Sequence, residues 1–156
     1  MTKKVMIVTG GSRGIGAEIA TLGAADGYAV CISYVKNKAA ADTVVAAIRE
    51  AGGTAIAVAA DMAVEADILR LFATVDQELG TLTALVNNAG ILETQMRVDQ
   101  MDVARMQRIF NTNIVGAFVC AREAVKRMST KYGGAGGAIV NISSVAARAG
   151  LSLIHI

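Results

Sequence analysis

Several residue types are scarce in this 156-residue sequence, and each shortage argues against a class of protein. The single histidine, His155, cannot build a metal cluster, so we expect no metal site. Cys31 and Cys120, the two cysteines, lie inside apolar stretches, which indicates buried thiols in a reducing compartment rather than a disulfide framework. The formal net charge is only +2, and the basic residues are scattered, which argues against a nucleic-acid partner. No apolar run approaches the roughly 18 residues of a spanning helix, so we expect a cytoplasmic protein that does not enter a membrane. The complete absence of proline has no evident physical reason.

What is abundant is apolar sequence, which makes up 54% of the chain and alternates between short runs and longer amphipathic stretches. The short β-branched runs predict strands at 4–9, 28–34, 54–60, 84–90 and 138–143. Helices are predicted at 13–26, 38–51 and 64–79, with one or two more within 102–131. Helical spacing places apolar residues of the third helix at Ile68, Leu69, Phe72, Val75 and Leu79, and of the last at Ile114, Phe118, Ala121 and Val125. Strands that are apolar on both faces, each followed by a helix, specify a Rossmann-like, doubly wound parallel α/β sheet.

A glycine-rich turn joins the first strand to the first helix, with the sequence Thr-Gly-Gly-Ser-Arg-Gly-Ile-Gly over residues 9–16. Gly10 can make a tight turn, Gly14 leaves no Cβ in the path of a phosphate, and Gly16 lets the helix pack close to the sheet. The helix N-terminus offers unpaired N–H groups to a pyrophosphate. A turn with a structural role only is the alternative. The pattern predicts a dinucleotide site that includes Gly10, Ser12, Arg13, Gly14, Ile15 and Gly16.

The gap between Gly10 and Gly14 holds three residues, which is longer than the first gap of the common dinucleotide fingerprint, and Thr9 precedes it. In this respect the sequence resembles the short-chain dehydrogenase/reductase family, whose pattern is TGxxxGxG. Further segments match the family in order: Asp61-Met62, the Asn-Asn-Ala-Gly run over 87–90, the Asn-Thr-Asn run over 111–113, and Asn-Ile-Ser-Ser over 141–144. The resemblance covers residues 4 to about 150.

The resemblance implies roles for the residues in these segments. Asp61 and Met62 would hold the adenine, and Asn88, Ala89 and Gly90 would line the nicotinamide side. Asn113 takes the position of a catalytic asparagine that holds a water for proton relay, and Ser144 that of the serine that hydrogen-bonds the substrate oxygen. Seen alone, Asn88 could be only a turn former and Asn113 only a polar helix residue.

The end of the second strand predicts which dinucleotide binds. An NAD site usually places a carboxylate there for the ribose 2′-hydroxyl, but none lies between Asp26 and Asp42. Tyr34 ends the strand, and Arg13 can reach a 2′-phosphate with its planar guanidinium, assisted by Lys36 or Asn37. In the family, a basic residue at the position of Arg13 accompanies preference for NADP(H). We therefore expect NADP(H) as the cofactor; an Arg13 that merely sits on the surface is the alternative.

The family's chemistry needs a Tyr-x-x-x-Lys pair about a dozen residues after the serine, and no such pair follows Ser144. Tyr132 cannot substitute, because glycine and alanine follow it and it precedes the fifth strand. The last six residues, LSLIHI, are what a transposon end used in sequencing libraries, CTGTCTCTTATACACATC, encodes in one frame. We therefore expect a C-terminally truncated NADP(H)-binding domain over 1–150, a non-native tail over 151–156, and no turnover by the chain as given. A natural short variant is the alternative.

The resemblance implies an oxidoreductase that transfers a hydride between NADP(H) and a small carbonyl or alcohol substrate. A catalytically incomplete NADP(H)-binding module is a second hypothesis. A methyltransferase-like domain is disfavoured, because it would leave the Asn-Asn-Ala-Gly and Asn-Ile-Ser-Ser runs unexplained. The family's sheet continues with two more strands, so we expect the strand at 138–143 to be an exposed edge and the back faces of the last helices to lack cover. The full-length protein is expected to be a homo-oligomer, a dimer or tetramer.

Overall fold

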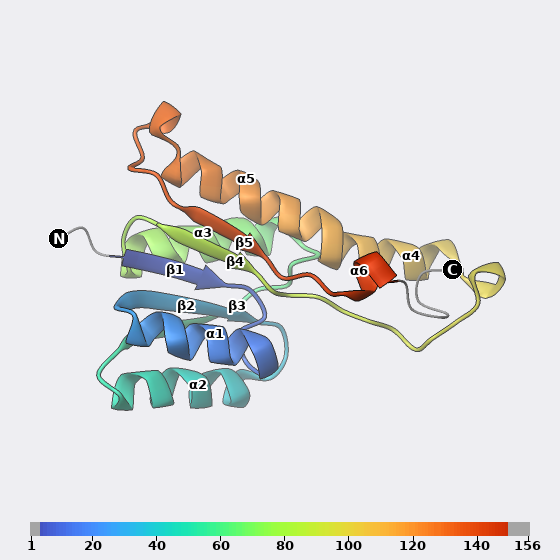
Figure 1. Cartoon of the computed structure of the whole chain (residues 1–156), viewed down its shortest axis with the longest axis horizontal. Coiled ribbons are helices and arrows are strands. Elements are labelled where there is room, and N and C mark those ends of the chain that lie inside the picture. Colours follow the sequence, from blue (N-terminus) through green and yellow to red (C-terminus); the bar gives the residue numbers. More distant parts are fainter. Residues whose placement is uncertain (1–3, 150–156) are drawn as a thin grey trace.

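The computed structural model describes residues 4–149 and shows a five-stranded parallel sheet (Figure 1). Its strand order is β3-β2-β1-β4-β5, where the strands are β1 (Lys4–Val8), β2 (Tyr28–Tyr34), β3 (Thr54–Ala59), β4 (Ala84–Asn87) and β5 (Ala138–Asn141). Every neighbouring pair is parallel, which confirms the predicted doubly wound α/β class. The tail over 151–156 lies outside the described residues.

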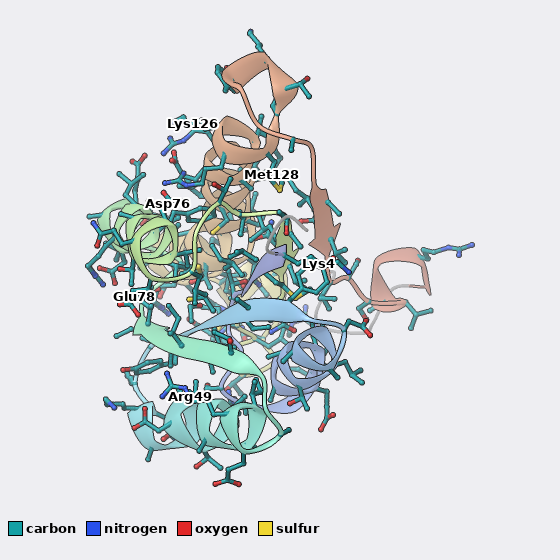
Figure 2. The ribbon with its side chains drawn as sticks, turned by 90° about the vertical axis from the view of Figure 1, so that its left-hand side faces the viewer. Lys4, Arg49, Asp76, Glu78, Lys126 and Met128 are labelled. Atoms are coloured by element: carbon teal, nitrogen blue, oxygen red, sulfur yellow. The ribbon has the colours of Figure 1, made fainter. Side chains whose placement is uncertain are left out.

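Helices cover both faces of the sheet, as Figures 1 and 2 show. One face carries α1 (Gly14–Ala25) and α2 (Lys38–Glu50), and the other carries α3 (Glu65–Glu78) and α5 (Gly116–Met128). Two apolar clusters lie between the layers, one built around Val30, Ile32 and Ile48 and the other around Ile7, Phe72 and Leu85. Because each face buries its own cluster, the strands need to be apolar on both sides, as their sequences are.

The third helix departs from its predicted pattern at one position. α3 buries Ile68, Leu71, Phe72 and Val75, whereas Leu69 is 42% exposed. Leu71 lies on the same face as Ile68 and Phe72 at helical spacing, while Leu69 is turned about 100° away from Ile68. Leu69, although one of the apolar positions at helical spacing, is therefore not part of the buried face of α3.

The predicted helical stretch 102–131 is divided into α4 (Val103–Phe110), a π-turn (Asn111–Val115) and α5. α5 buries Gly116, Cys120, Ala124 and Met128 against the sheet. The apolar stripe through Ile114, Phe118 and Val125 instead faces outward, with exposed fractions of 48%, 74% and 45%. The chain thus carries apolar side chains on a face of α5 that nothing in the described residues covers.

The fourth and fifth strands are shorter than predicted. β4 ends at Asn87 rather than residue 90, because the next N–H group, that of Asn88, donates to the Thr9 hydroxyl instead of continuing the ladder. β5 ends at Asn141 and pairs only with β4, so it forms one edge of the described sheet, as expected. Among residues 4–149, no helix is both long and apolar enough to cross a membrane.

Candidate functional site at the carboxyl edge of the sheet

The order of the strands defines where a ligand would bind. From β1 the chain winds outward through β2 and β3, and from β4 it winds the other way to β5. In open α/β sheets ligands bind at such a switch point, in the crevice outside the carboxyl ends of the strands. Here that crevice lies between the ends of β1 and β4, where the glycine-rich turn enters α1.

The geometry of this turn depends on three glycines. Gly10 has φ +66° and Gly14 has φ +54°, which is the left-handed region that favours glycine. A Cβ on Gly16 would lie 2.5 Å from Nδ2 of Asn88 and 2.6 Å from the carbonyl oxygen of Gly10, so this position admits no side chain. A Cβ on Gly14 would meet nothing within 4 Å, which leaves the space in front of the turn open.

The N-terminus of α1 carries no anion of its own. Arg13 occupies the N-cap position, makes no side-chain cap and is exposed, and the first turn contains no acidic residue. The first N–H to donate back along the chain is that of Ala17, to the carbonyl of Arg13 at 3.3 Å. The preceding N–H groups of the first turn therefore have no helical acceptor, and together with the positive end of the helix dipole and the exposed Arg13 they make an arrangement suited to phosphate.

Side chains from two neighbouring strands fix the turn. The Gly10 N–H donates to the Ser33 hydroxyl at 3.0 Å, and the Gly11 N–H donates to the Ser33 carbonyl at 3.0 Å. From the other side, Nδ2 of Asn88 donates to the carbonyls of Thr9 and Gly10 at 2.9 and 3.2 Å. The Thr9 hydroxyl accepts the N–H groups of Asn88 and Ala89, both at 3.0 Å. Asn88 is thus a structural anchor of the turn as well as a predicted cofactor contact.

Ser33 was not among the predicted site residues, although the sequence carries a signal for it. It is a buried polar residue in the otherwise apolar strand Tyr-Ala-Val-Cys-Ile-Ser-Tyr. A buried hydroxyl needs a hydrogen-bond partner, and the partner here is the Gly10 N–H of the glycine-rich turn.

At the end of β2, the half-buried Tyr34 packs against the apolar cluster between the sheet and α1–α2. The side-chain oxygen of Asn37 is engaged, because it caps α2 by accepting the Ala40 N–H at 2.9 Å. The Lys36 carbonyl accepts the Lys38 N–H at 3.2 Å, whereas the Lys36 ammonium makes no hydrogen bond or ion pair among residues 4–149. Of the two residues expected to assist Arg13, only Lys36 carries a charge, and its side chain is the one not engaged by a neighbour.

The predicted adenine pair follows β3. Asp61 accepts the Ala63 N–H with one carboxylate oxygen at 2.9 Å and remains partly exposed. The Met62 side chain is buried at 4% exposure, and its sulfur lies 3.7 Å from the Cys120 sulfur under α5. If Met62 contacts an adenine, its backbone must therefore make that contact.

On the β4–β5 side, a groove of about 280 Å³ lies beside the ends of both strands. Its lining includes Asn113, together with Asn87, Ala89, Phe118, Asn141 and Ile142. Asn113 is held against the neighbouring loop, since its Oδ1 accepts the Ile91 N–H at 2.8 Å and its Nδ2 donates to the Ile91 carbonyl at 2.9 Å. One amide hydrogen and one lone pair remain for a water. Gly90 adjoins Asn113, with the nearest contact of a hypothetical Cβ at 3.6 Å.

Asn87 connects the elements that form the groove, although the sequence predicted no individual role for it. Its Nδ2 donates to Asn141 Oδ1 at 3.0 Å and to the Ala117 carbonyl at 3.2 Å, which joins β4, β5 and α5. Ser144 follows β5 and is exposed, and its hydroxyl oxygen accepts the Ala146 N–H at 3.1 Å. That bond orients the hydroxyl and leaves its hydrogen free to donate to a substrate.

Among the described residues, no tyrosine side chain lines this groove. Tyr132 lies in a short 3-10 turn, Thr130–Tyr132, after the C-terminal end of α5. A Tyr-x-x-x-Lys spacing does occur once in the sequence, at Tyr34 and Lys38, but it precedes Ser144 in the chain. The Lys38 ammonium is paired with Asp42 at 2.7 Å at the start of α2, on the β2 side of the sheet.

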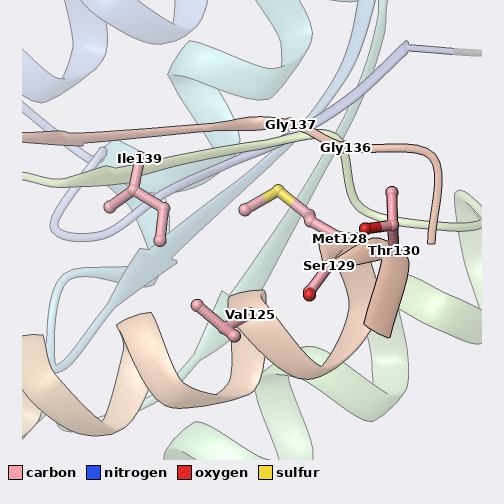
Figure 3. A pocket seen from close by; sticks show the side chains of 7 residues that line it. All are labelled: Val125, Met128, Ser129, Thr130, Gly136, Gly137 and Ile139. Carbon is pink, nitrogen blue, oxygen red and sulfur yellow. The ribbon is translucent and has the colours of Figure 1, made fainter. Parts of the chain in front are cut away.

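A second groove, of about 330 Å³, is shown in Figure 3. It lies between the C-terminal end of α5 and the chain entering β5, and Val125, Met128, Gly137 and Ile139 line it. This is the amino edge of the sheet, opposite the crevice where α/β domains bind ligands. The carboxyl edge is therefore the candidate site.

Comparison with known proteins agrees with this geometry. The short chain dehydrogenase family matches residues 4–155. The uncharacterized oxidoreductase YgfF of Escherichia coli is 50% identical over 146 residues, which are 94% of this chain and 59% of that protein. The 3-oxoacyl-[acyl-carrier-protein] reductase of Synechocystis is 38% identical over 96% of this chain and 59% of that protein.

Among solved structures, a short chain dehydrogenase from Burkholderia cenocepacia in complex with NADP superposes with a TM-score of 0.88. It is 37% identical, and the match covers 96% of this chain and 59% of that one. A short-chain dehydrogenase/reductase from Serratia marcescens superposes with a TM-score of 0.85 at 34% identity, over 92% and 56% of the two chains. The chain thus spans rather more than half of the length of the proteins it resembles.

Proposed function

Because the chain belongs to the short chain dehydrogenase family, we propose that the whole protein is an NADP(H)-dependent oxidoreductase acting on a carbonyl or alcohol substrate. The observation that carries the proposal is the phosphate cradle with a cation beside it: an open turn at Gly14, a bare helix N-terminus and the exposed Arg13. The Burkholderia protein, similar over nearly the whole chain, was solved with NADP, which supports the same cofactor here.

The residues present fit a doubly phosphorylated dinucleotide. We assign the pyrophosphate to the turn over 10–16 and the 2′-phosphate to Arg13, with Lys36 near the end of β2. Asp61 and the Met62 backbone would hold the adenine, beyond Tyr34. On the other side of the switch point, the run Asn88–Gly90 would border the nicotinamide. When bound, the cofactor supplies or accepts the hydride.

The chain's own residues would then orient the substrate and a proton. The Ser144 hydroxyl, with its oxygen already accepting the Ala146 N–H, would donate its hydrogen to the carbonyl oxygen. Asn113 would hold a water with the amide groups that Ile91 leaves free. The names of similar proteins include a 3beta-hydroxysteroid dehydrogenase and a 3-oxoacyl-[acyl-carrier-protein] reductase. Both names refer to a hydroxyl or oxo group, so we confine the substrate to that class.

For the 156 residues alone we propose cofactor binding without turnover. Within the described residues, no tyrosine lines the groove beside Asn113. The second candidate, a catalytically incomplete NADP(H)-binding module, rests on the same observation. Assaying the full-length protein with NADPH and a panel of small ketones separates the two, because only the oxidoreductase consumes NADPH.

We also propose that the full-length protein is a cytoplasmic homo-oligomer, a dimer or a tetramer. The apolar stripe exposed on α5 supports this proposal, because a partner subunit or a further segment of the chain would cover it. Light scattering of the full-length protein tests this, and a monomer at micromolar concentration would contradict it.

The cofactor assignment is tested by titrating NADPH and NADH into the chain and following nicotinamide fluorescence. NADPH should bind at least about tenfold more tightly than NADH, because a guanidinium–phosphate pair is a strong charge-assisted contact. Arg13→Ala should remove most of this preference, and Tyr34→Asp should shift it toward NADH by repelling the 2′-phosphate. Lys131→Ala, which removes an exposed cation at the far end of α5, is the matched control and should change neither affinity. Comparable affinities of the unmodified chain for both cofactors would refute the assignment.

A further inference from the structure

The loop between β4 and α4 contains a carboxylate that two arginines hold. Arg105, in the first turn of α4, is only 8% exposed, which is unusual for a cation. Its Nη1 donates to the Glu93 carboxylate at 3.0 Å, and its Nη2 donates to the Thr94 carbonyl at 2.6 Å. One buried guanidinium thus binds both a side chain and the backbone of the loop.

Arg108, one helical turn further on, holds the same carboxylate from a second direction. Its Nε donates to one Glu93 oxygen at 2.8 Å and its Nη2 to the other at 3.0 Å, a bidentate pair. The Arg108 hydrogen bond, which outweighs the opposing effect of partial burial, lowers the pKa of Glu93, so the carboxylate is ionised at neutral pH. Two cations on consecutive turns of one rigid helix therefore fix a single anion of the loop.

The π-turn that follows α4 adds a third attachment on the same helix face. On an undistorted helix, at 100° per residue, position 112 would point between Arg105 and Arg108, and position 113 would be turned about 80° away from Arg105. The π-turn holds more residues per turn than an α-helix, which rotates Asn113 back toward the direction of Arg105. Asn113 accordingly binds the Ile91 peptide at the start of the loop segment that Arg105 and Arg108 hold.

The segment Ile91–Thr94 lies directly beyond the carboxyl end of β4, on the side of the switch point away from β2 and β3. Ala89, just before it, packs against Gly10 of the phosphate turn. If the pyrophosphate sits at α1 and the adenosine over β2–β3, this segment borders the other half of the dinucleotide.

We propose that Glu93, held by Arg105 and Arg108, is a positioning residue that keeps the segment Ile91–Thr94 fixed beside the nicotinamide half of the cofactor site. This inference rests on the proposed function, since it assumes that a dinucleotide occupies the crevice. On this proposal, the contact of Glu93 with the two arginines affects the binding of the nicotinamide half alone. A contact that merely stabilised the fold would affect the binding of both halves alike.

The test compares two probes on the 156-residue chain. NADPH occupies both halves of the site, whereas adenosine 2′,5′-bisphosphate lacks the nicotinamide and its ribose. Glu93→Gln keeps the side-chain shape but removes the charge, so it should speed hydrogen exchange in the peptide covering 91–94. The same variant should weaken NADPH about tenfold and leave adenosine 2′,5′-bisphosphate unchanged. Arg108→Gln, at an exposed position that tolerates substitution, should show the same pattern more weakly.

The control is Asp99→Asn in the same loop, which breaks an exposed pair with Arg97 and should change neither exchange nor affinity. Equal losses for both probes, or an unchanged NADPH affinity in Glu93→Gln, would overturn the inference. An unmodified chain that binds neither probe would instead refute the proposed function itself, and with it the inference, so the two failures are distinguishable.

Discussion

At the scale of single residues, the glycine-rich turn before α1 depends on a hydroxyl that comes from the neighbouring strand. Ser33 is buried and accepts the Gly10 N–H, while its carbonyl accepts the Gly11 N–H. Ser33→Ala should destabilise the fold by about 1–3 kcal/mol, because the Gly10 N–H loses its acceptor in a partly buried place. It should also weaken NADPH binding, because the turn is no longer fixed.

Urea unfolding and NADPH titration measure the two effects of Ser33→Ala. The matched control is Thr74→Ala on α3, whose hydroxyl bonds only to the Arg70 carbonyl within its own helix. If Ser33→Ala unfolded and bound NADPH like the unmodified chain, the role assigned to this hydroxyl would be wrong.

The two cysteines illustrate how burial removes reactivity. Both are free and buried, as predicted from their apolar neighbours. Burial, reinforced by the charge of Glu123, raises the pKa of Cys120 to about 12, and burial likewise raises the pKa of Cys31. Both thiols are therefore neutral at pH 8, and the thiolate is the reactive form.

We expect neither thiol to react with Ellman's reagent at pH 8 until urea unfolds the chain, when both should react. Rapid labelling of one thiol per chain in native buffer would show that one of the two cysteines is not buried. Because the sequence contains no other cysteine, the absorbance reports directly on these positions.

At the scale of elements, a buried carboxylate joins α3 to α5. Glu123 of α5 is 5% exposed and accepts hydrogen bonds from Arg122, Lys126 and Arg127. Arg127 in turn pairs with Asp76 of α3 at 2.8 Å, and its guanidinium lies 5.0 Å from the centre of the Phe72 ring. Figure 2 shows Asp76 and Lys126 on these two neighbouring helices.

This network predicts a pH dependence. Burial alone would raise the pKa of Glu123, but hydrogen bonds from Lys126, Arg122 and Arg127 lower it below its ordinary value of 4.5. A carboxyl whose pKa is lower in the folded than in the unfolded state stabilises the fold above its unfolded pKa. That contribution is lost as the pH falls through the lowered value.

Glu123→Gln should cost about 2 kcal/mol of unfolding free energy at pH 7, and the difference from the unmodified chain should shrink at about pH 3.5. Urea unfolding at both pH values measures it. Glu50→Gln, at the exposed C-terminal end of α2, should show no such pH-dependent difference. A deficit for Glu123→Gln that was the same at both pH values would contradict the assignment.

At the scale of the whole molecule, the face formed by α5 and β5 leaves apolar surface in water. Phe118 is 74% exposed on α5, and Val140 and Ile142 are 49% and 39% exposed on and beside the edge strand β5. The two grooves described above lie along this face, one of them shown in Figure 3. An exposed edge strand beside an apolar patch is a site of association between chains.

We therefore expect the 156-residue chain to self-associate at micromolar concentration and to bind the dye ANS. Phe118→Ser should reduce both effects without lowering the urea midpoint, because the ring is exposed in the folded chain. Leu92→Ser removes a side chain that is 80% exposed but lies in the loop after β4, so it should have little effect. A chain that sediments as a monomer and does not bind ANS would contradict this expectation.

The pattern of apolar residues predicted all five strands and the helices between them, but not where the elements end nor which apolar positions of α3 and α5 face water. Strand ends were missed where a side chain replaced the ladder partner, as the Thr9 hydroxyl does for the Asn88 N–H. Leu69 counted among the apolar positions because it lies three residues before Phe72, although the direction of its Cα–Cβ bond leaves it 42% exposed.

The sequence by itself determined the alternation of elements and the glycine-rich turn between β1 and α1, because the apolar pattern and the glycine backbone angles act locally. Glycine at 10, 14 and 16 works through its own φ or through the absence of its own Cβ. Only the tertiary structure decided what holds the cradle and the loop beyond β4. Ser33 reaches Gly10 across 23 residues, Asn113 reaches Ile91 across 22, and Arg105 reaches Glu93 across 12. Such contacts exist only once the sheet has brought distant segments to one edge, and no local spacing encodes them.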